Sequence, residues 1–417
     1  MARMTGGRYM AEIFKGYGVT HAFLVPVIAR RAMVEMGELG ITRVITHGEK
    51  AAAYMADGYA RASNRVGVCM AQSVGAANLA AGLQDAYLGL SPVVAITGHR
   101  PPMHMYRNSY QEIDHIQPFS AVTKYSAMVD DVQQLPYLLR QAFREATSGA
   151  TAPVHLDLQG NSADAIADAE ADLELIIERD FLQRPSFRPE PEPARVREAA
   201  QILATAQRPV IVAGGGVTAS GAQREIVELA EMLSIPVATS LNAKGAVPED
   251  HRLSVGVVGS YSRRSANQVV SEADMVVFVG SHTGSQVTLD WTVPAMGTPV
   301  IQIDIDPSEL GRSYPTTAAL QGDAKVSLRR LIEASEPPVN RSTWVDRARQ
   351  LVQEWKDEVE PLANSDDVPI RPERLCTALT NSMPSDAILT VDTGHAGIWT
   401  GSMVAVSYTH LKLATRL

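Results

Sequence analysis

The chain has 417 residues, 45% hydrophobic and 20% charged, which is typical of two or three globular domains rather than of a disordered protein. A formal net charge of −9 and the lack of a basic run in the sequence argue against a nucleic-acid-binding surface. Two cysteines (Cys69, Cys376) cannot form a disulfide framework, and no apolar run reaches the ~18–20 residues of a membrane helix, so we expect a reduced, cytoplasmic protein with buried free thiols and no membrane contact.

Apolar runs and helical stretches alternate from residue 8 to about residue 160. Short strands are expected at the end of 18–25 and at 42–46, 66–71 and 92–97. Helices are expected at 49–62 and 78–87, because alanine-rich segments without proline favour a helix. Near-continuous apolar strands separated by helices predict a parallel sheet that is covered on both faces. We therefore expect residues 1–165 to form one domain.

A second unit of the same kind is expected at residues 196–335. The segment 166–195 is acidic and then proline-rich, which is typical of a linker. Strands are expected at 209–213, 236–239, 275–280 and 299–305, with a helix from three glycines to about Leu233. A second linker is expected at 336–368, although 344–358 has a helical pattern.

The remaining segment, 369–405, offers one helix at 371–381 and one strand at 387–391. So small a unit cannot bury a core, so we interpret it as the truncated start of a third domain. Residues 406–417 continue no pattern; we expect an artefact, with a genuine short tail as the alternative. The predicted fold class is α/β, with successive open parallel-sheet domains.

The most informative position is Glu49, just past the strand 42–46 and at the start of the helix 49–62. Open α/β sheets bind ligands at the carboxyl ends of their strands. A glutamate at a helix start also complements the helix dipole. Its position alone therefore leaves a ligand contact and a purely structural role both open.

The segment Glu49–Arg61 reads EKAAAYMADGYAR. It resembles the E-x-x-A-A-x-x-A-x-G-Y-A-R segment in the pyrimidine-binding domain of thiamine diphosphate (ThDP) dependent enzymes of the acetolactate synthase large-subunit type. The resemblance implies that Glu49 is catalytic and hydrogen-bonds N1′ of the cofactor's aminopyrimidine. Sharing a proton there favours the imino tautomer, whose nitrogen takes the proton from the thiazolium C2.

Two further segments carry the resemblance. Residues 72–78 read QSVGAAN and are similar to the family's S-G-P-G-x-x-N turn, which implies that Ser73, Gly75 and Asn78 bind the cofactor. Gly75 and Asn78 match outright, whereas Ser73 stands where the family has glycine. The tripeptide 110–112 is similar to the family's F-Q-E, which implies that Gln111 lines the reaction centre; an ordinary loop residue is the alternative.

One segment departs from the family. Acetolactate synthases carry G-x-P-G-G after the first strand, where this chain has Leu24-Val25-Pro26-Val27-Ile28. Two glycines beside the cofactor have become branched residues, and valine does not adopt a positive φ easily. We therefore expect a different acceptor pocket.

The third unit resembles the opening of the family's diphosphate-binding domain. This implies that Thr393, Gly394 and His395 contact the diphosphate. The family holds the bridging Mg²⁺ with a G-D-G motif and a later asparagine. Neither follows in this chain, so we assign no metal ligand and expect the ligands of Mg²⁺ outside it. The chain as written would then be non-catalytic.

The central unit resembles the domain in which acetolactate synthases bind FAD. A glycine run at 214–216 follows an expected strand and could meet a phosphate. The family's FAD-contacting R-F-D-D-R segment is absent, since residues 281–288 read SHTGSQVT. The sequence leaves FAD open as a second cofactor.

The resemblance implies ThDP-dependent decarboxylation of a 2-keto acid, with pyruvate as donor, followed by carboligation to a second carbonyl. A decarboxylase without ligation and an acyl-transferring relative are the alternatives. A nicotinamide-dependent dehydrogenase is disfavoured, because 212–217 lacks the G-x-G-x-x-G spacing. Sites of this family form between the first domain of one subunit and the third of another, which implies a homodimer or homotetramer.

Overall fold

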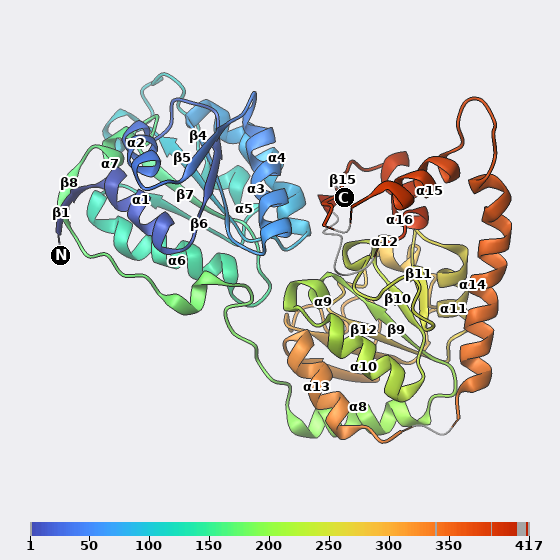
Figure 1. Cartoon of the computed structure of the whole chain (residues 1–417). Coiled ribbons are helices and arrows are strands. Elements are labelled where there is room, and N and C mark those ends of the chain that lie inside the picture. Colours follow the sequence, from blue (N-terminus) through green and yellow to red (C-terminus); the bar gives the residue numbers. More distant parts are fainter. Residues whose placement is uncertain (1, 338–339, 385, 407–413, 416–417) are drawn as a thin grey trace. The chain divides into compact units, whose positions relative to one another are not determined.

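The computed structural model describes residues 2–337, 340–384, 386–406 and 414–415. They form two compact units, one up to Phe187 and one from Arg188 onward (Figure 1). Both units are built on a parallel sheet, which confirms the predicted α/β class. No helix in these ranges is long and apolar enough to cross a membrane.

The first unit contains a six-stranded parallel sheet in the order β3-β2-β4-β5-β7-β6. Its strands are β2 (His21–Leu24), β3 (Thr42–Ile45), β4 (Gly67–Ala71), β5 (Val93–His99), β6 (Tyr125–Val129) and β7 (Val154–Gln159). The helices are α1 (Gly6–Gly16), α2 (Arg30–Glu38), α3 (Glu49–Ser63), α4 (Ala76–Leu88), α5 (Ile116–Ser120), α6 (Leu135–Thr147) and α7 (Asp164–Ala167).

Both faces of the inner strands β4, β5 and β7 are buried, as the apolar strands predict, whereas the edge strand β3 is mostly exposed. Successive side chains of a strand point to opposite faces. Val68 and Met70 of β4 belong to the core beneath α1, α2 and α6. Cys69 and Ala71 belong to the core beneath α3 and α4. Cys69 and Cys376 are both free and buried, as expected.

The second unit repeats this plan with a parallel sheet in the order β11-β10-β9-β12-β13-β14. Its strands are β9 (Pro209–Ala213), β10 (Val237–Thr239), β11 (Ser254–Val257), β12 (Met275–Val279), β13 (Val300–Asp304) and β14 (Ala318–Gln321). The helices on the sheet are α8 (Pro193–Thr205), α9 (Gly215–Ser220), α10 (Gln223–Leu233), α11 (Arg264–Glu272), α12 (Ser285–Thr288) and α13 (Ala324–Ala334). The single helix expected up to Leu233 is thus two, separated at Gly221, whose φ is +64°.

The C-terminal segment packs within the second unit. The long helix α14 (Ser342–Ala363) lies against α11 and contacts α15 (Pro372–Ser382) (Figure 1). Helix α16 (His395–Met403) is bonded to the residue before α11, because Arg263 donates from Nε to the carbonyl of Ser402 at 2.7 Å. The short strand β15 (Thr390–Val391) pairs with β16 (Ala414–Thr415). Most of the expected tail 406–417 lies outside the described residues.

The segments expected to be linkers contain regular structure. β8 (Glu170–Leu173) pairs antiparallel with β1 (Ala2–Thr5), so the first unit extends beyond residue 165. Sequence patterns could not show this pairing, because it joins segments far apart in the chain. Most of 336–368 is the helix α14. That 369–405 opens a separate domain remains a prediction.

Candidate functional site

Glu49 is the first residue of α3 and follows the carboxyl end of β3 after a three-residue turn. Thr46 braces this turn by donating from its hydroxyl to the carbonyl of Gly48 at 2.9 Å. The Glu49 side chain is half-buried, and its Oε2 accepts a hydrogen bond from Nδ2 of Asn78 at 3.2 Å. The structure therefore brings together two sequence-predicted residues from the first turns of α3 and α4.

Glu49 and Asn78 form a corner of the site, and Gly75 completes it. It ends the 3₁₀ turn Ser73–Gly75, which joins the carboxyl end of β4 to α4. A Cβ atom at Gly75 would lie 2.5 Å from Oε1 of Glu49, closer than any real contact. The missing side chain thus leaves room for the carboxylate of Glu49, and we see here a ligand-independent reason for glycine at this position.

Gln111 belongs to a loop that is bonded beside this corner. Ser73 donates from Oγ to the carbonyl of Gln111 at 2.5 Å. Asn161 donates from Nδ2 to Oε1 of Gln111 at 2.8 Å and accepts the backbone N–H of Ser73 at 3.1 Å. Asn161 follows β7 and was not found from the sequence. Its only signal was its place just after an apolar strand.

The departing segment after β2 lies at the same edge of the sheet, because β2 is placed between β3 and β4. Val27 is 42% exposed and has φ +82°, so it adopts the conformation that valine disfavours. Ala29 also has a positive φ and donates its N–H to the carbonyl of Ser162 at 2.7 Å. The segment after β2 therefore contacts Ser162, the residue that follows Asn161.

The three remaining sequence-predicted residues lie in the second unit. Gly394, with φ +70°, immediately precedes α16, and His395 begins that helix. The N–H of Thr393 donates to Oδ1 of Asp392 at 2.8 Å, and its hydroxyl lies 3.4 Å from the hydroxyl of Tyr261. The predicted residues thus form two sets, one in each unit.

A buried polar network that the sequence did not predict lies within the first sheet. Thr97 of β5 donates its hydroxyl to Oδ1 of Asp157 at 2.6 Å, so its oxygen must accept from Nε2 of His155, also at 2.6 Å. Nδ1 of the neutral ring then accepts from the hydroxyl of Ser126 at 2.8 Å. Burial agrees with a neutral ring, since it lowers the pKa of His155 to about 3.

Two more histidines contact the other side of Asp157. Nδ1 of His115 lies 3.1 Å from both carboxylate oxygens, and Nδ1 of His99 lies 3.5 Å from Oδ2. Burial alone would raise the pKa of Asp157, but the hydrogen bonds from His115 and His99 hold it well below its ordinary value. Asp157 is therefore ionised; it is hydrogen-bonded to the ring of His115, and the ring of His99 faces it at the longer ion-pair distance.

The glycine run of the central sheet does not fit a phosphate site. A Cβ atom at Gly214 would lie 2.1 Å from the carbonyl oxygen of Gly280, and one at Gly216 would lie 2.7 Å from its Cα. The N–H groups of Gly214 and Gly216 already donate to the carbonyls of Val279 and Gly280. Close packing of two loops therefore explains this motif, and it gives FAD no support.

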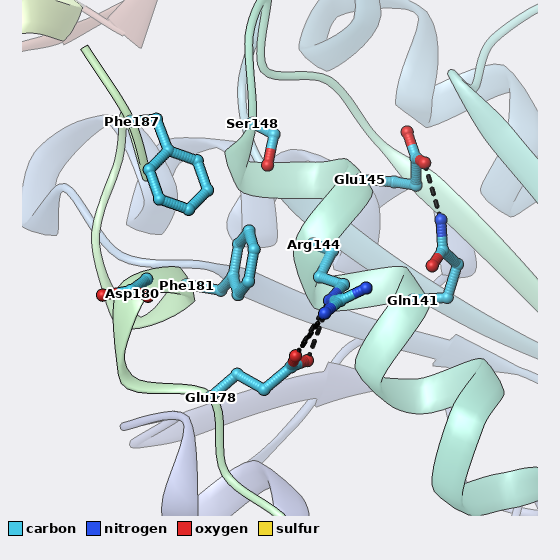
Figure 2. Close-up of a pocket in the computed structure, with 8 residues that line it drawn as sticks. All are labelled: Gln141, Arg144, Glu145, Ser148, Glu178, Asp180, Phe181 and Phe187. Atoms are coloured by element: carbon cyan, nitrogen blue, oxygen red, sulfur yellow. Dashed lines mark hydrogen bonds and ion pairs between the residues drawn. The ribbon is translucent and has the colours of Figure 1, made fainter.

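Among the described residues, no group of three or more His, Cys, Asp and Glu side chains could hold a metal ion. Figure 2 shows an open pocket elsewhere on the first unit, lined by residues of α6 and of the segment 178–187. Its volume is about 620 Å³. Two of its charged side chains already pair with each other, because Nε of Arg144 donates to Glu178 at 3.0 Å. None of the sequence-predicted site residues lines it.

Two segments match known protein families. Residues 4–117 match the thiamine pyrophosphate enzyme N-terminal TPP binding domain, and residues 196–331 match the thiamine pyrophosphate enzyme central domain. Thiamine pyrophosphate is another name for ThDP. The first match contains Glu49, Ser73, Gly75, Asn78 and Gln111.

Whole-chain relatives agree with these matches. A protein of Methanocaldococcus jannaschii named "Probable acetolactate synthase large subunit" is 36% identical over 95% of this chain and 68% of its own length. An "Acetolactate synthase" of Arthrospira platensis is 31% identical over 96% of this chain and 70% of its own. The Escherichia coli "Acetolactate synthase isozyme 2 large subunit" is 30% identical, with 96% and 71% covered.

Proposed function

Because this chain belongs to the ThDP-dependent enzymes of the acetolactate synthase large-subunit type, we propose that it decarboxylates a 2-keto acid, with pyruvate as donor, and joins the product to a second carbonyl compound. The observation that carries the proposal is the corner of Glu49, Gly75 and Asn78. It sets a carboxylate at a helix start, at the carboxyl edge of a parallel sheet. Ligands of open α/β sheets bind at this edge.

Each residue of the corner has a physical task. Asn78 holds Oε2 of Glu49, and Gly75 keeps the space beside Oε1 free of a side chain. The carboxylate can therefore exchange a proton with a ring nitrogen placed beside it. Bound ThDP would supply the electron sink that decarboxylation of a 2-keto acid requires. Ser73 and Asn161 fix Gln111 beside the corner, where an amide can donate to a reacting oxygen.

The second set of residues fits a diphosphate because it lies at the start of a helix. Thr393, Gly394 and His395 precede or begin α16, a helix of nine residues whose N-terminal end favours an anion. We propose that they would contact the diphosphate of bound ThDP, and we assign no ligand of Mg²⁺ to the described residues. We do not extend the proposal to FAD. A homodimer or homotetramer is proposed from the family alone.

Glu49→Gln tests the assignment. Glutamine keeps the size of the side chain and the bond to Asn78 but cannot exchange a proton, so we expect turnover of pyruvate to fall by about 100-fold or more. Carbon dioxide release in the presence of ThDP and Mg²⁺ is the measurement, made on a protein that also carries the G-D-G motif and asparagine expected to hold Mg²⁺. Product analysis separates ligation from simple decarboxylation.

The matched control is Lys50→Gln, at the exposed neighbouring position. It should leave turnover unchanged, and circular dichroism should show both variants folded. If Glu49→Gln kept the wild-type rate, Glu49 would have only a structural role. If that Mg²⁺-competent protein, with Glu49 intact, neither bound ThDP in calorimetry nor released carbon dioxide, the proposed function itself would fail.

A further inference from the structure

The loop that carries Gln111 runs from the end of β5 to the start of α5 and spans residues 100–114. It is largely exposed; Tyr106, for example, is 93% exposed. Tyr106, Asn108 and Gln111 all have positive φ, a conformation that asparagine tolerates but that is unfavourable for tyrosine and glutamine. Such a loop needs strong contacts to keep one conformation.

The loop is braced from inside. Both carboxylate oxygens of Glu112 accept backbone N–H groups, from Tyr106 at 2.5 Å and from Ser109 at 3.0 Å. These bonds lower the pKa of Glu112, so its carboxylate stays ionised. Nε of Arg100 donates to the carbonyl of Tyr110 at 2.6 Å. Because these bonds lie within the loop, they preserve its shape but do not fix it to the sheet.

The two ends of the loop are held by one carboxylate. His99 is the last residue before the loop and His115 is the first after it, and both rings face Asp157 of β7 at 3.5 and 3.1 Å. Asp157 is 1% exposed and His115 is 1% exposed. In such a site charged hydrogen bonds are strong, and removing one partner leaves the other unsatisfied.

We propose that Asp157 is a positioning residue that holds both ends of the loop 100–114 through His99 and His115, and thereby fixes Gln111 in the site. Its effect on catalysis rests on the proposed function; its effect on the loop does not. The direct bonds to Gln111 from Ser73 and Asn161 are ordinary neutral ones, worth about 1 kcal/mol each. Asn161 aligns the Gln111 side chain and Ser73 holds its main-chain carbonyl, whereas Asp157 holds the two ends of the loop.

The clamp, which consists of Asp157 with His99 and His115, depends on pH. The groups that face His99 are Asp157 from β7 and Asp130 after β6, at 3.5 and 3.1 Å; His115 shares Asp157. Burial lowers the pKa of His99, but these two carboxylates outweigh it and raise the pKa above its ordinary value. His99 therefore keeps its proton to higher pH than an ordinary histidine does. Rising pH removes this charge and weakens one end of the clamp.

Limited trypsin digestion of the full chain tests the clamp, because Arg107 lies exposed in the loop. In Asp157→Asn, asparagine preserves shape but loses the charge, so we expect cleavage after Arg107 to become about tenfold faster or more. Cleavage after Arg65, exposed in a turn between α3 and β4, serves as the internal reference. In the wild type, the ratio of the two rates should rise as the pH is increased above about 6.5, the ordinary pKa of histidine, because His99 then loses its proton.

Ser126→Ala is the matched control, since it removes a bond of the same network on the far side of His155 and leaves Asp157 with both loop ends. It should not change the ratio. If Asp157→Asn accelerated cleavage at both arginines equally, it would be a general destabilisation and the clamp would be refuted. His115→Gln provides a second variant that releases one end only, should Asp157→Asn fail to fold; an unchanged ratio there would also refute the clamp.

Kinetics separate this inference from the proposed function. With the clamp loosened in the Mg²⁺-competent protein described under Proposed function, we expect kcat to fall by roughly 10- to 100-fold while ThDP affinity, measured by calorimetry, stays near the wild-type value. Selective cleavage with an unchanged kcat would overturn the positioning role. Selective cleavage in a protein whose wild type shows no turnover would overturn the proposed function and leave the clamp intact.

Discussion

At the scale of single residues, Val27 holds the least favourable backbone conformation near the site. A β-branched residue at φ +82° crowds its Cβ against the neighbouring backbone. Such strain persists only where surrounding contacts impose it, here the bond between Ala29 and Ser162 and the burial of Ile28. The side chain of Val27 is exposed at the sheet edge that holds Glu49, which is consistent with the expectation of an altered acceptor pocket.

Val27→Gly should stabilise the first unit by about 1 kcal/mol, because glycine relieves the strain and this gain exceeds its larger entropy loss on folding. Urea denaturation at neutral pH measures the change. The comparison is Val34→Gly, also exposed but inside α2, where glycine should destabilise by about 1 kcal/mol. If both variants lost stability equally, the strain at Val27 would be disproved.

At the scale of elements, β7 combines two tasks. Its residues 154, 156 and 158 belong to the apolar core beneath α1 and α6, while His155 and Asp157 face the other side and form the polar network. His155 also stacks on Phe119 of α5, with ring centroids 3.6 Å apart. A strand with this alternation positions α5 as well as the loop before it.

The neutral state of His155 predicts an acid-sensitive fold. Its pKa is lowered to about 3 in the folded protein, whereas the unfolded chain takes up this proton at about pH 6.5. Proton uptake by the unfolded state means that stability is lost as pH falls below about 6.5. Urea midpoints at pH 7 and pH 5.5 should therefore differ less in His155→Gln than in the wild type. The exposed His104→Gln should retain the wild-type difference; equal slopes in all three proteins would exclude His155 as the cause.

Elements with a local signal could be predicted from the sequence. Strands β4, β5, β9 and β12 are apolar runs, and α3 is an alanine-rich segment whose start at Glu49 the structure confirms. By contrast, β8 is acidic and depends on its partner β1, which no local pattern reveals. The same reason explains which site residues could be predicted from the sequence and which could not. Resemblance indicated Glu49, Asn78 and Gln111, whereas Asn161 and Asp157 are linked to the site only by contacts across the sheet.

At the scale of the whole molecule, each unit has its own hydrophobic core on both sides of its own sheet. The core of the first unit includes Leu173 and Phe181, beyond the predicted boundary at residue 165. A chain cut at that boundary would lose both side chains as well as β8. We therefore expect a first unit that ends at residue 187 to fold independently with a complete core, and one that ends at residue 165 to lack part of it.

A fragment of residues 1–187 should unfold cooperatively, with a midpoint close to one transition of the full chain, because its core is complete. A fragment of residues 1–165 should be less stable by about 4 kcal/mol, the worth of burying one leucine and one phenylalanine. Thermal and urea unfolding followed by circular dichroism measure both. Equal stability of the two fragments would contradict the role of β8 and Phe181.

The strand order has a consequence for folding kinetics. β7 is the last strand of its sheet to be synthesised, yet it lies between β5 and β6. Until β7 inserts, β5 presents an unpaired edge and β6 has no neighbour, and unpaired edges promote aggregation. Thr97 and Asp157, 60 residues apart, can meet only after that insertion. The nascent first unit should therefore depend on chaperones until residue 159 has left the ribosome, and the loop of Gln111 should acquire its position late.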